Sequence, residues 1–461
     1  MADPPRVRKN VDEISDEELA NYKHALKRLY EISAADPDSI DGYTYFEQLH
    51  DGDTGPCEHA NDTFLPWHRA HLYLFEEALR RSDPPRTQNV TIPYWDWSAL
   101  PSGQRYAKAF EENGSPLRHA RNSKRICRAV GDTNCDRLPF PRSHLESEIL
   151  SISLWASPPT AKSEPSFGGY AGGESNCKSP FGEGFGSLEE PAHNSMHGGL
   201  IGGDMADPSS ASLDPIFWSF HAYFDLLLWQ WQQMDGHSVD TGLESRLCGL
   251  FKDREHLPEN RFRVKDVLNV ESQLGYTYAY SGHIPAPMKD QAEKLFATHP
   301  AVDLVLSGRR EPDVLRSIDV VVPAADFNQA RLNFTGVQVR TPFSYGADIY
   351  LAPESEKFTP RETAFREKYL VDFIYIWKAH EHGGHGGHHD HDVQVTTHDM
   401  VVDVTKQLRS LSRVQGGQKW KVWVALASQS DETEPSDRSM IQPELEVASK
   451  IDFDEVKLEI R

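Results

Sequence analysis

Apolar residues recur at helical spacing in four stretches of the first half of the chain. In the first stretch they occupy positions 19, 22, 26 and 29, at intervals of three or four. Ser15 and Glu18, which lie three residues apart just before this run, are typical of a capping box at a helix start. Similar spacing predicts helices over residues 43–50, 67–81 and 214–234. The last stretch is packed with aromatic and apolar residues.

From about Pro285 the pattern changes to short alternating runs separated by turn-rich segments. The runs are Ile318–Val322, Leu332–Val339, Ala347–Leu351, Tyr369–Trp377, Met400–Val404, Trp420–Leu426 and Val456–Ile460. Strands at this spacing favour an all-β sandwich or barrel. We therefore predict a polar N-terminal arm at residues 1–14, a mainly α domain built as a four-helix bundle at 15–290, and an all-β domain at 300–461.

Length and charge agree with a soluble protein of two cores. The chain has 461 residues, more than one ordinary domain holds. Its net charge of −22 argues against nucleic acid or an anionic membrane as a partner. No apolar run reaches the ~18 residues of a membrane span. The start lacks the apolar core of a signal peptide, which favours a cytoplasmic location, and the sequence leaves the oligomeric state open.

Histidines form two sets of three, and this pattern predicts a paired metal site. The first set is His50, His59 and His68, and the second is His193, His197 and His221. In the second set, positions 193 and 197 are four residues apart, so both side chains leave one face of a helix. Six imidazoles without a carboxylate favour a borderline-soft transition metal over magnesium or calcium, although geometry alone leaves zinc or iron open beside copper.

With these motifs, the chain resembles the type-3 copper proteins, which include tyrosinases, catechol oxidases and molluscan-type hemocyanins. The resemblance rests on H-x8-H-x8-H in the first set, on HNxxH and DPxFxxxHxxxD in the second, and on the YWDW segment within Ile92–Trp97. It implies two copper ions that use O2 to oxidise a phenol or o-diphenol to an o-quinone. The alternative is a hemocyanin-like carrier that binds O2 reversibly at the same site.

The resemblance also implies roles for residues around the histidines. Cys57 lies two residues before His59, the spacing at which part of the family forms a thioether bond, and a free buried thiol is the alternative. Asp96 and Asp225 stand at positions that support ligating imidazoles in the family. Glu76 and Arg69 are further candidates for this role or for salt bridges between helices.

Hydroxylation of a monophenol requires a base, for which the family often uses a glutamate and an asparagine. Glu189, four residues before His193, and Asn194 match this arrangement, with Glu190 as the second choice for the base. Either glutamate could instead stabilise a helix start. Phe220 stands where many members carry a histidine beside the ligand, which leaves copper binding in place because the ligand is His221.

Three further features concern the rest of the chain. Leu274–Tyr278 resembles the tyrosine motif that closes the family's catalytic domain, and Arg8 is the candidate for a cation–π contact with it. The other cysteines, at positions 127, 135, 177 and 248, are either reduced or paired. The histidine-rich tract His380–His391 is either a transient metal site or a surface hairpin. The C-terminal domain resembles the shielding domain of plant and bacterial oxidases.

Overall fold

The computed structural model describes most of the first half of the chain and the strands of the second half. The described residues are 4–51, 57–99, 106–121, 142, 145–158, 165–171, 184–247, 249–250, 263–280, 302–305, 314–321, 330–339, 345–359, 365, 369–376, 397–403, 408, 419–426, 451–452 and 455–460. They form two compact units, one drawn from residues up to Pro287 and the other mainly from Met288 onward.

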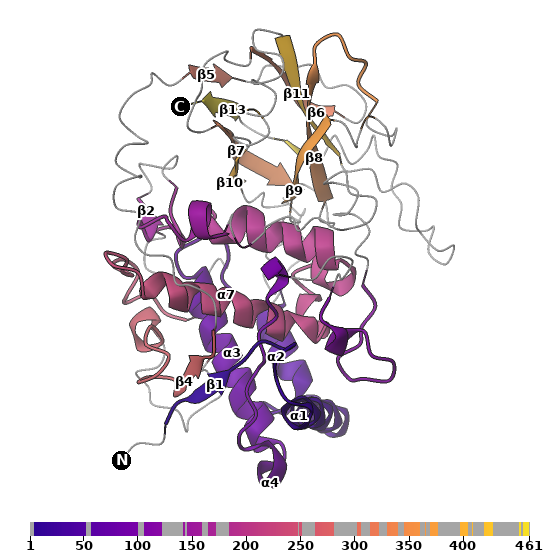
Figure 1. Ribbon diagram of the computed structural model, residues 1–461, viewed down its shortest axis with the longest axis vertical. Coiled ribbons are helices and arrows are strands. Elements are labelled where there is room, and N and C mark those ends of the chain that lie inside the picture. The colour runs from indigo at the N-terminus through magenta and orange to yellow at the C-terminus, as the bar shows by residue number, and fades with distance from the viewer. Residues whose placement is uncertain are drawn as a thin grey trace, which may run out of the picture. The chain divides into compact units, whose positions relative to one another are not determined.

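Helices dominate the first unit (Figure 1). The α-helices are α1 (Asp16–Ala35), α2 (Tyr43–His50), α3 (Phe64–Arg81), α4 (Pro84–Thr87) and α7 (Ile216–Gln232). The shorter helical segments are η1 (Trp97–Ala99), η2 (Lys108–Phe110), η3 (Leu145–Ile149), η4 (Leu188–His193), η5 (Met196–Ile201), η6 (Gly203–Ala206), η7 (Ala211–Leu213) and η9 (Val264–Asp266). The four predicted helices are confirmed as α1, α2, α3 and α7.

The capping box predicted at the start of α1 is confirmed. The Ser15 hydroxyl accepts the Glu18 N–H at 3.2 Å, and the Glu18 carboxylate accepts the Ser15 N–H at 2.9 Å. Both bonds satisfy N–H groups that the first helical turn leaves without a partner. The helix therefore begins at Asp16. The acidic side chains of its first turn also interact favourably with the positive end of the helix dipole.

Helix α7 lies in the interior of the first unit. Its side chains are buried on nearly every side, and it packs against α3, which also contacts α1. An all-round apolar surface suits a helix that has protein on all sides. Among the described residues, no helix is long and apolar enough to cross a membrane.

The N-terminal segment, predicted as a polar arm, contributes a strand to the first unit. Strand β1 (Arg6–Arg8) pairs in parallel with β4 (Tyr276–Tyr278), with Arg8 opposite Tyr278. A second two-stranded pair joins β2 (Ala156–Ser157) and β3 (Gly169–Tyr170). The β1–β4 pair brings together residues that are about as far apart in the sequence as the first unit allows.

From Met288 onward, strands make up most of the described part of the second unit. They are β5 (Val302–Val305), β6 (Val314–Val321), β7 (Ala330–Val339), β8 (Tyr345–Pro353), β9 (Leu370–Ile376), β10 (Thr397–Asp403), β11 (Lys419–Leu426), β12 (Ile451–Asp452) and β13 (Glu455–Ile460). One sheet has the order β10-β7-β13-β5, with β12 also paired to β7, and the other has the order β6-β11-β8-β9. Every pair is antiparallel. Each of the seven predicted runs overlaps one of these strands.

The inner strand β11 shows why these sequences form a sheet. Its residues alternate between two faces, and Val422 and Trp423, on opposite faces, are both buried. Trp423 belongs to an apolar cluster with Tyr350, Phe365 and Tyr369. β11 also lies between β6 and β8 in its sheet, so both of its faces and both of its edges are covered.

Candidate metal centre

Three helices place a histidine at one buried point. His50 is the last residue of α2, and His68 and His221 lie in the second turns of α3 and α7. One ligand atom from each lies within 4.8 Å of the others. The rings of His68 and His221 are stacked, with their centroids 4.8 Å apart and their planes 10° from parallel. The structure thus brings together His50 and His221, which are 171 positions apart in the sequence.

The second nitrogen of each of these rings is held by a backbone carbonyl. The Nδ1 atoms of His68 and His221 lie 2.9 Å from Phe64 O and 3.0 Å from Phe217 O, one turn earlier in their own helices. The Nδ1 of His50 lies 3.1 Å from Pro208 O. A carbonyl oxygen only accepts hydrogen bonds, so each Nδ1 carries the proton and each Nε2 keeps its lone pair. This arrangement orients Nε2 as the metal-binding nitrogen.

The spacing of two Nε2 atoms fits a cation. The Nε2 atoms of His50 and His68 are 3.2 Å apart. With both Nδ1 atoms protonated, two lone pairs would face each other without an intervening positive charge. Burial lowers the pKa of His50 to about 4, so a proton does not supply that charge near neutral pH. Imidazole nitrogens in a buried site are suitable ligands for a transition metal, and the residues present therefore fit one.

His59 lies close to Cys57 in a second group. One ligand atom each from His50, Cys57 and His59 lies within 4.8 Å of the other two. Cys57 is a buried, free cysteine, and burial raises the pKa of its thiol. The thiol is thus near the imidazole to which the sequence predicts a covalent bond.

The carboxylate of Glu189 contacts the Nδ1 side of the His59 ring. Its Oε1 lies 3.2 Å from His59 Nδ1, and the N–H of Ala60 donates to both carboxylate oxygens, at 3.0 and 3.1 Å. Ala60 has a φ of +54°, and it is the one non-glycine residue in the described part of the chain with a positive φ. Backbone strain of this kind is concentrated at functional sites. Here it accompanies the turn that directs one N–H at Glu189.

A third group consists of His193, His197 and His221, whose ligand atoms lie within 4.8 Å of one another. His193 Nδ1 lies 2.8 Å from the side-chain oxygen of Asn194, and the Asn194 amide donates to Glu190 at 2.6 Å. Glu190 therefore fixes the amide that faces His193. His221 is common to this group and to the first one, whereas the sequence analysis assigned it to the second set alone.

The neighbouring glutamates have different contacts because the chain bends between them. Glu190 has extended backbone angles, φ −124° and ψ 124°, inside an otherwise helical stretch. It precedes Pro191, and a residue before proline is disfavoured in the helical region. Glu189 consequently contacts His59 and Glu190 contacts Asn194. Sequence reasoning treated Glu190 as a substitute for Glu189, and the proline was the signal that could have separated them.

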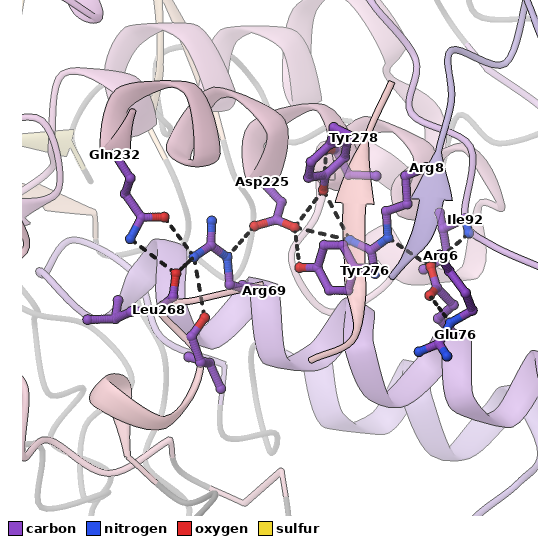
Figure 2. Close-up of polar contacts among 12 residues, drawn as sticks. Arg6, Arg8, Arg69, Glu76, Ile92, Asp225, Gln232, Leu268, Tyr276 and Tyr278 are labelled. Carbon is purple, nitrogen blue, oxygen red and sulfur yellow. Dashed lines mark hydrogen bonds and ion pairs between the residues drawn. The ribbon is translucent and has the colours of Figure 1, made fainter. Parts of the chain in front are cut away.

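Asp225 is the centre of a buried polar network, which Figure 2 shows. It accepts hydrogen bonds from Arg8 at 3.0 Å, from the Tyr276 hydroxyl at 2.6 Å, from Tyr278 and from the Arg69 Nε. Burial by itself would raise the pKa of Asp225, but the positive charges of Arg69 and Arg8 and the two hydroxyl bonds hold that pKa below its usual value.

The arginine end of the network confirms the predicted cation–π contact. The Arg8 guanidinium carbon lies 3.7 Å from the centroid of the Tyr276 ring. Arg8 Nε also donates to Glu76 at 2.8 Å, and Glu76 accepts the Ile92 N–H at 3.0 Å and a bond from Arg80 at 2.8 Å. The network therefore ties β1 and β4 to both α3 and α7.

The predicted imidazole partners Asp96 and Asp225 make other contacts. Asp96 accepts the N–H of Ser98 at 3.1 Å and its hydroxyl at 2.6 Å, and that hydroxyl also contacts Tyr223 at 2.6 Å. Within the described part of the chain, neither aspartate hydrogen bonds to one of the six histidines. The two aspartates were predicted to contact the second nitrogen of the histidine rings. Backbone carbonyls, Glu189 and Asn194 make those contacts instead. Asp225 acts one turn away from His221, through helix α7.

Of the remaining predicted features, the structure describes Phe220 but not the other cysteines or the histidine-rich tract. Phe220 is buried, and its ring meets His221 edge-on, at 5.1 Å between centroids. The cysteines at positions 127, 135, 177 and 248 and the tract His380–His391 lie outside the described residues.

Comparisons with known proteins agree with this geometry. Residues 37–234 match the model of the common central domain of tyrosinase. A tyrosinase of Hahella sp. (strain CCB-MM4) is 28% identical over 336 residues, which cover 65% of this chain and 68% of that protein. The chain spans about half the length of the chloroplastic polyphenol oxidases that it matches.

Solved structures share the fold. A latent apple tyrosinase superposes with a TM-score of 0.58 at 15% identity, covering 100% of this chain and 98% of that chain. A functional unit of octopus hemocyanin gives a TM-score of 0.52 at 18% identity, covering 92% and 96%. Together with the histidine groups, the tyrosinase central domain matched over residues 37–234 and these shared folds support a place for the chain in the type-3 copper family.

Proposed function

We propose that this protein is a polyphenol oxidase that uses O2 to oxidise phenols and o-diphenols to o-quinones. The observation that carries the proposal is the convergence of the Nε2 atoms of His50 and His68, 3.2 Å apart, with His221 beside them. The matched relatives are named tyrosinase, polyphenol oxidase and catechol oxidase, which supports the same conclusion.

Two copper ions are the cofactor of the proposed reaction. His50, His59 and His68 would hold one ion, and His193, His197 and His221 would hold the other. Copper supplies the transfer of electrons from the phenol to O2, while the protein supplies ligand geometry, burial and access. The Nδ1 contacts of His50, His68 and His221 support this assignment because they place the ring proton on Nδ1 and the lone pair on Nε2.

Glu189 would take part in phenol hydroxylation as a base. A monophenol must lose its hydroxyl proton before its oxygen can bind a metal, and a positioned carboxylate is a suitable acceptor. Glu189 is buried and held by two bonds from Ala60, so its position is fixed before a substrate arrives. Asn194, itself fixed by Glu190, would help to hold the water or phenol oxygen near Glu189.

Cys57 would form a thioether bond to His59. The support is the two-residue spacing together with the proximity of the thiol to the His59 ring. Formation of the bond removes one hydrogen from sulfur and one from the ring carbon, with O2 as the oxidant. The bond would fix the orientation of a ring that Glu189 already holds at Nδ1.

The second unit would be a β-sandwich at residues 300–461 that shields the catalytic domain at 15–290. Burial of both faces of β11 supports a sandwich, because one face needs a second layer to cover it. The latent form named for the apple tyrosinase supports a shielding role. Limited proteolysis near residue 290 tests it: activity that does not rise after cleavage would contradict shielding.

The main experiment measures metal content and oxidation on the same sample. We expect two copper ions per chain and quinone formation from catechol, with tyrosine and tyramine as monophenol comparisons. His68→Ala and His197→Ala should each lose one tightly bound ion and all oxidase activity. A single ion, or zinc in protein grown with ample copper, would contradict the proposal.

A reversible O2 carrier is the second candidate, because the octopus hemocyanin unit shares the fold. Copper-loaded protein that binds O2 reversibly and yields no quinone from catechol would identify the carrier.

A further inference from the structure

Aromatic side chains form a continuous series that starts at the histidine ligands. The ring of Trp67 lies 5.0 Å from that of His68 and 6.2 Å from that of His50, measured between centroids. His71, one turn after His68, lies 5.0 Å from Trp67 and 4.9 Å from Trp218. All five side chains are buried. Trp218 is thus joined to the ligand rings by aromatic groups in contact.

The series continues from Trp218 toward the surface through two tyrosines. The indole N–H of Trp218 donates to the Tyr43 hydroxyl at 3.2 Å. The ring of Tyr43 lies 4.5 Å from that of Tyr30, measured between centroids, with the two planes 47° apart. Tyr43 is buried, whereas Tyr30, on the outer part of α1, is partly exposed. The series therefore runs from the metal ligands to a residue that solvent reaches.

Ordinary core packing explains aromatic contacts, but it does not require this order of residue types. Indole and phenol are the aromatic side chains that lose an electron most readily, and phenylalanine is not. The core offers many phenylalanines, and Phe75 stacks directly on Trp218 at 3.5 Å. Yet the indole nitrogen donates to the hydroxyl of Tyr43, and the ring of Tyr43 packs against Tyr30, a second tyrosine nearer the surface.

We propose that Trp67, Trp218, Tyr43 and Tyr30 form a path for electrons from the surface to the metal centre. The path operates when the centre has been oxidised by O2 and no phenol is present to reduce it. The path would protect the histidines that bind the metal, because an electron from the path reduces the centre before the centre oxidises their side chains. The inference rests on the proposed function, which supplies the oxidising centre.

Each transfer balances as one electron and one proton. An electron passes from Tyr30 through Tyr43, Trp218 and Trp67 to the centre, which is reduced by one electron. The Tyr30 phenol loses its hydroxyl proton to water and becomes a neutral radical. A hydrogen-atom donor in solution that is not a phenol, such as a thiol or ascorbate, then transfers one hydrogen atom to the radical and restores the Tyr30 phenol.

Tyr30 is the end of the path because its proton can leave. The Tyr43 hydroxyl is buried and donates to the carbonyl of Ser212 at 2.7 Å, so water does not reach its proton. Tyr30 is partly exposed, so a proton released from its hydroxyl has access to water. The oxidising equivalent therefore passes from Tyr43 to Tyr30.

The test locates the oxidised residue rather than measuring turnover. Copper-loaded protein is treated with hydrogen peroxide in the absence of phenols and in the presence of a spin trap, and labelled residues are identified by peptide mass spectrometry. The wild-type protein should carry the label at Tyr30. Tyr30→Phe and Trp218→Phe should lose that label, gain oxidation at the ligand histidines or Trp67, and lose activity sooner on repeated peroxide treatment.

A matched control is Tyr45→Phe. Tyr45 is also partly exposed and lies on α2 with Tyr43, but its ring contacts Phe46, at 5.4 Å. This variant should keep the wild-type label at Tyr30. The unfolding temperature and copper content of each variant establish that it is folded and loaded.

The outcomes separate the path from the proposed function. Equal labelling of Tyr30 in wild-type protein and Trp218→Phe would overturn the path, because a diffusing oxidant would then account for the label. Label spread over exposed tyrosines, Tyr45 included, would overturn it in the same way. Failure of the copper-loaded protein to oxidise catechol would instead contradict the proposed function.

Discussion

Replacement of Asp225 by asparagine tests whether the buried network holds the histidine-bearing helices α3 and α7 together. Asp225 faces two guanidinium groups, those of Arg8 and Arg69, and two tyrosine hydroxyls. Asn has nearly the same shape, but it removes the negative charge and turns an NH2 group toward cationic donors. The two arginines are buried, so water cannot replace the lost carboxylate without rearrangement.

The expected loss of stability is large for one isosteric change. Breaking a buried ion pair from one side typically costs about 3–5 kcal/mol, because the remaining charge is left uncompensated. At about 2–4 °C per kcal/mol for a domain of this size class, the unfolding temperature should fall by roughly 6–20 °C. Thermal unfolding followed by circular dichroism measures this fall, and urea unfolding measures the free energy.

The pH dependence gives an independent check on the cause. The folded-state pKa of Asp225 is lowered, so its contribution to stability is present above the pKa of the unfolded chain, about 3.9. The contribution is lost as pH falls below that value toward the folded pKa. Asp225→Asn lacks this contribution at every pH, so the difference in stability between wild type and variant should shrink on acidification.

The control is Glu244→Gln, which breaks ion pairs with Arg263 and Lys265 on an exposed surface. Exposed pairs contribute little, so its unfolding temperature should stay close to that of the wild type. A loss of unfolding free energy smaller than about 1 kcal/mol for Asp225→Asn would refute the reasoning. A loss of that size is what removal of an ordinary neutral hydrogen bond causes. A large fall with no change across the acid range would show that packing, and not charge, is responsible.

Three further outcomes are expected. If Cys57 is bonded to His59, the peptide that contains both should be lighter by two hydrogens, and an alkylatable Cys57 in active enzyme would exclude the bond. Glu189→Gln should slow monophenol hydroxylation by about 10²–10⁴-fold and catechol oxidation much less. Equal loss of both activities would mean that Glu189 only orients His59. Selective loss of hydroxylation in Glu190→Gln would assign the role of the base to Glu190. Ser15→Ala should cost about 1 kcal/mol of stability through loss of the capping box, and an unchanged free energy of unfolding would show that the start of α1 frays.

Helices were predictable from the sequence to within a few residues, and one boundary shows the limit. The sequence analysis began the third helix at Trp67, after Pro66, whereas α3 begins at Phe64. Proline is tolerated in the first turn because the N–H it lacks has no partner there. Local pattern identifies an element, but the packing of the apolar residues before the proline decides where it starts.

The grouping of the six histidines was predictable, whereas the contacts that hold their rings were not. Spacing along one helix identified His193 and His197, and the structure groups them with His221. The contacts of Asp225 depend on β1 and β4, which lie almost at opposite ends of the first unit's sequence. No local pattern encodes such a pairing. The resemblance to known proteins suggested a contact of Arg8 with the tyrosine motif and, as one alternative, salt bridges of Glu76 and Arg69 between helices.

The position of α7 explains why a buried network is useful at this site. The helix is apolar on all sides, so hydrophobic packing alone distinguishes poorly between rotations about its axis or shifts along it. Displacement of His221 by about 1 Å would be enough to spoil a metal site. Asp225 lies one turn from His221 on the same face and accepts bonds from three other elements, β1, α3 and β4. Those bonds form together in one register only, and because Arg69 is next to His68, the same register sets both ligands.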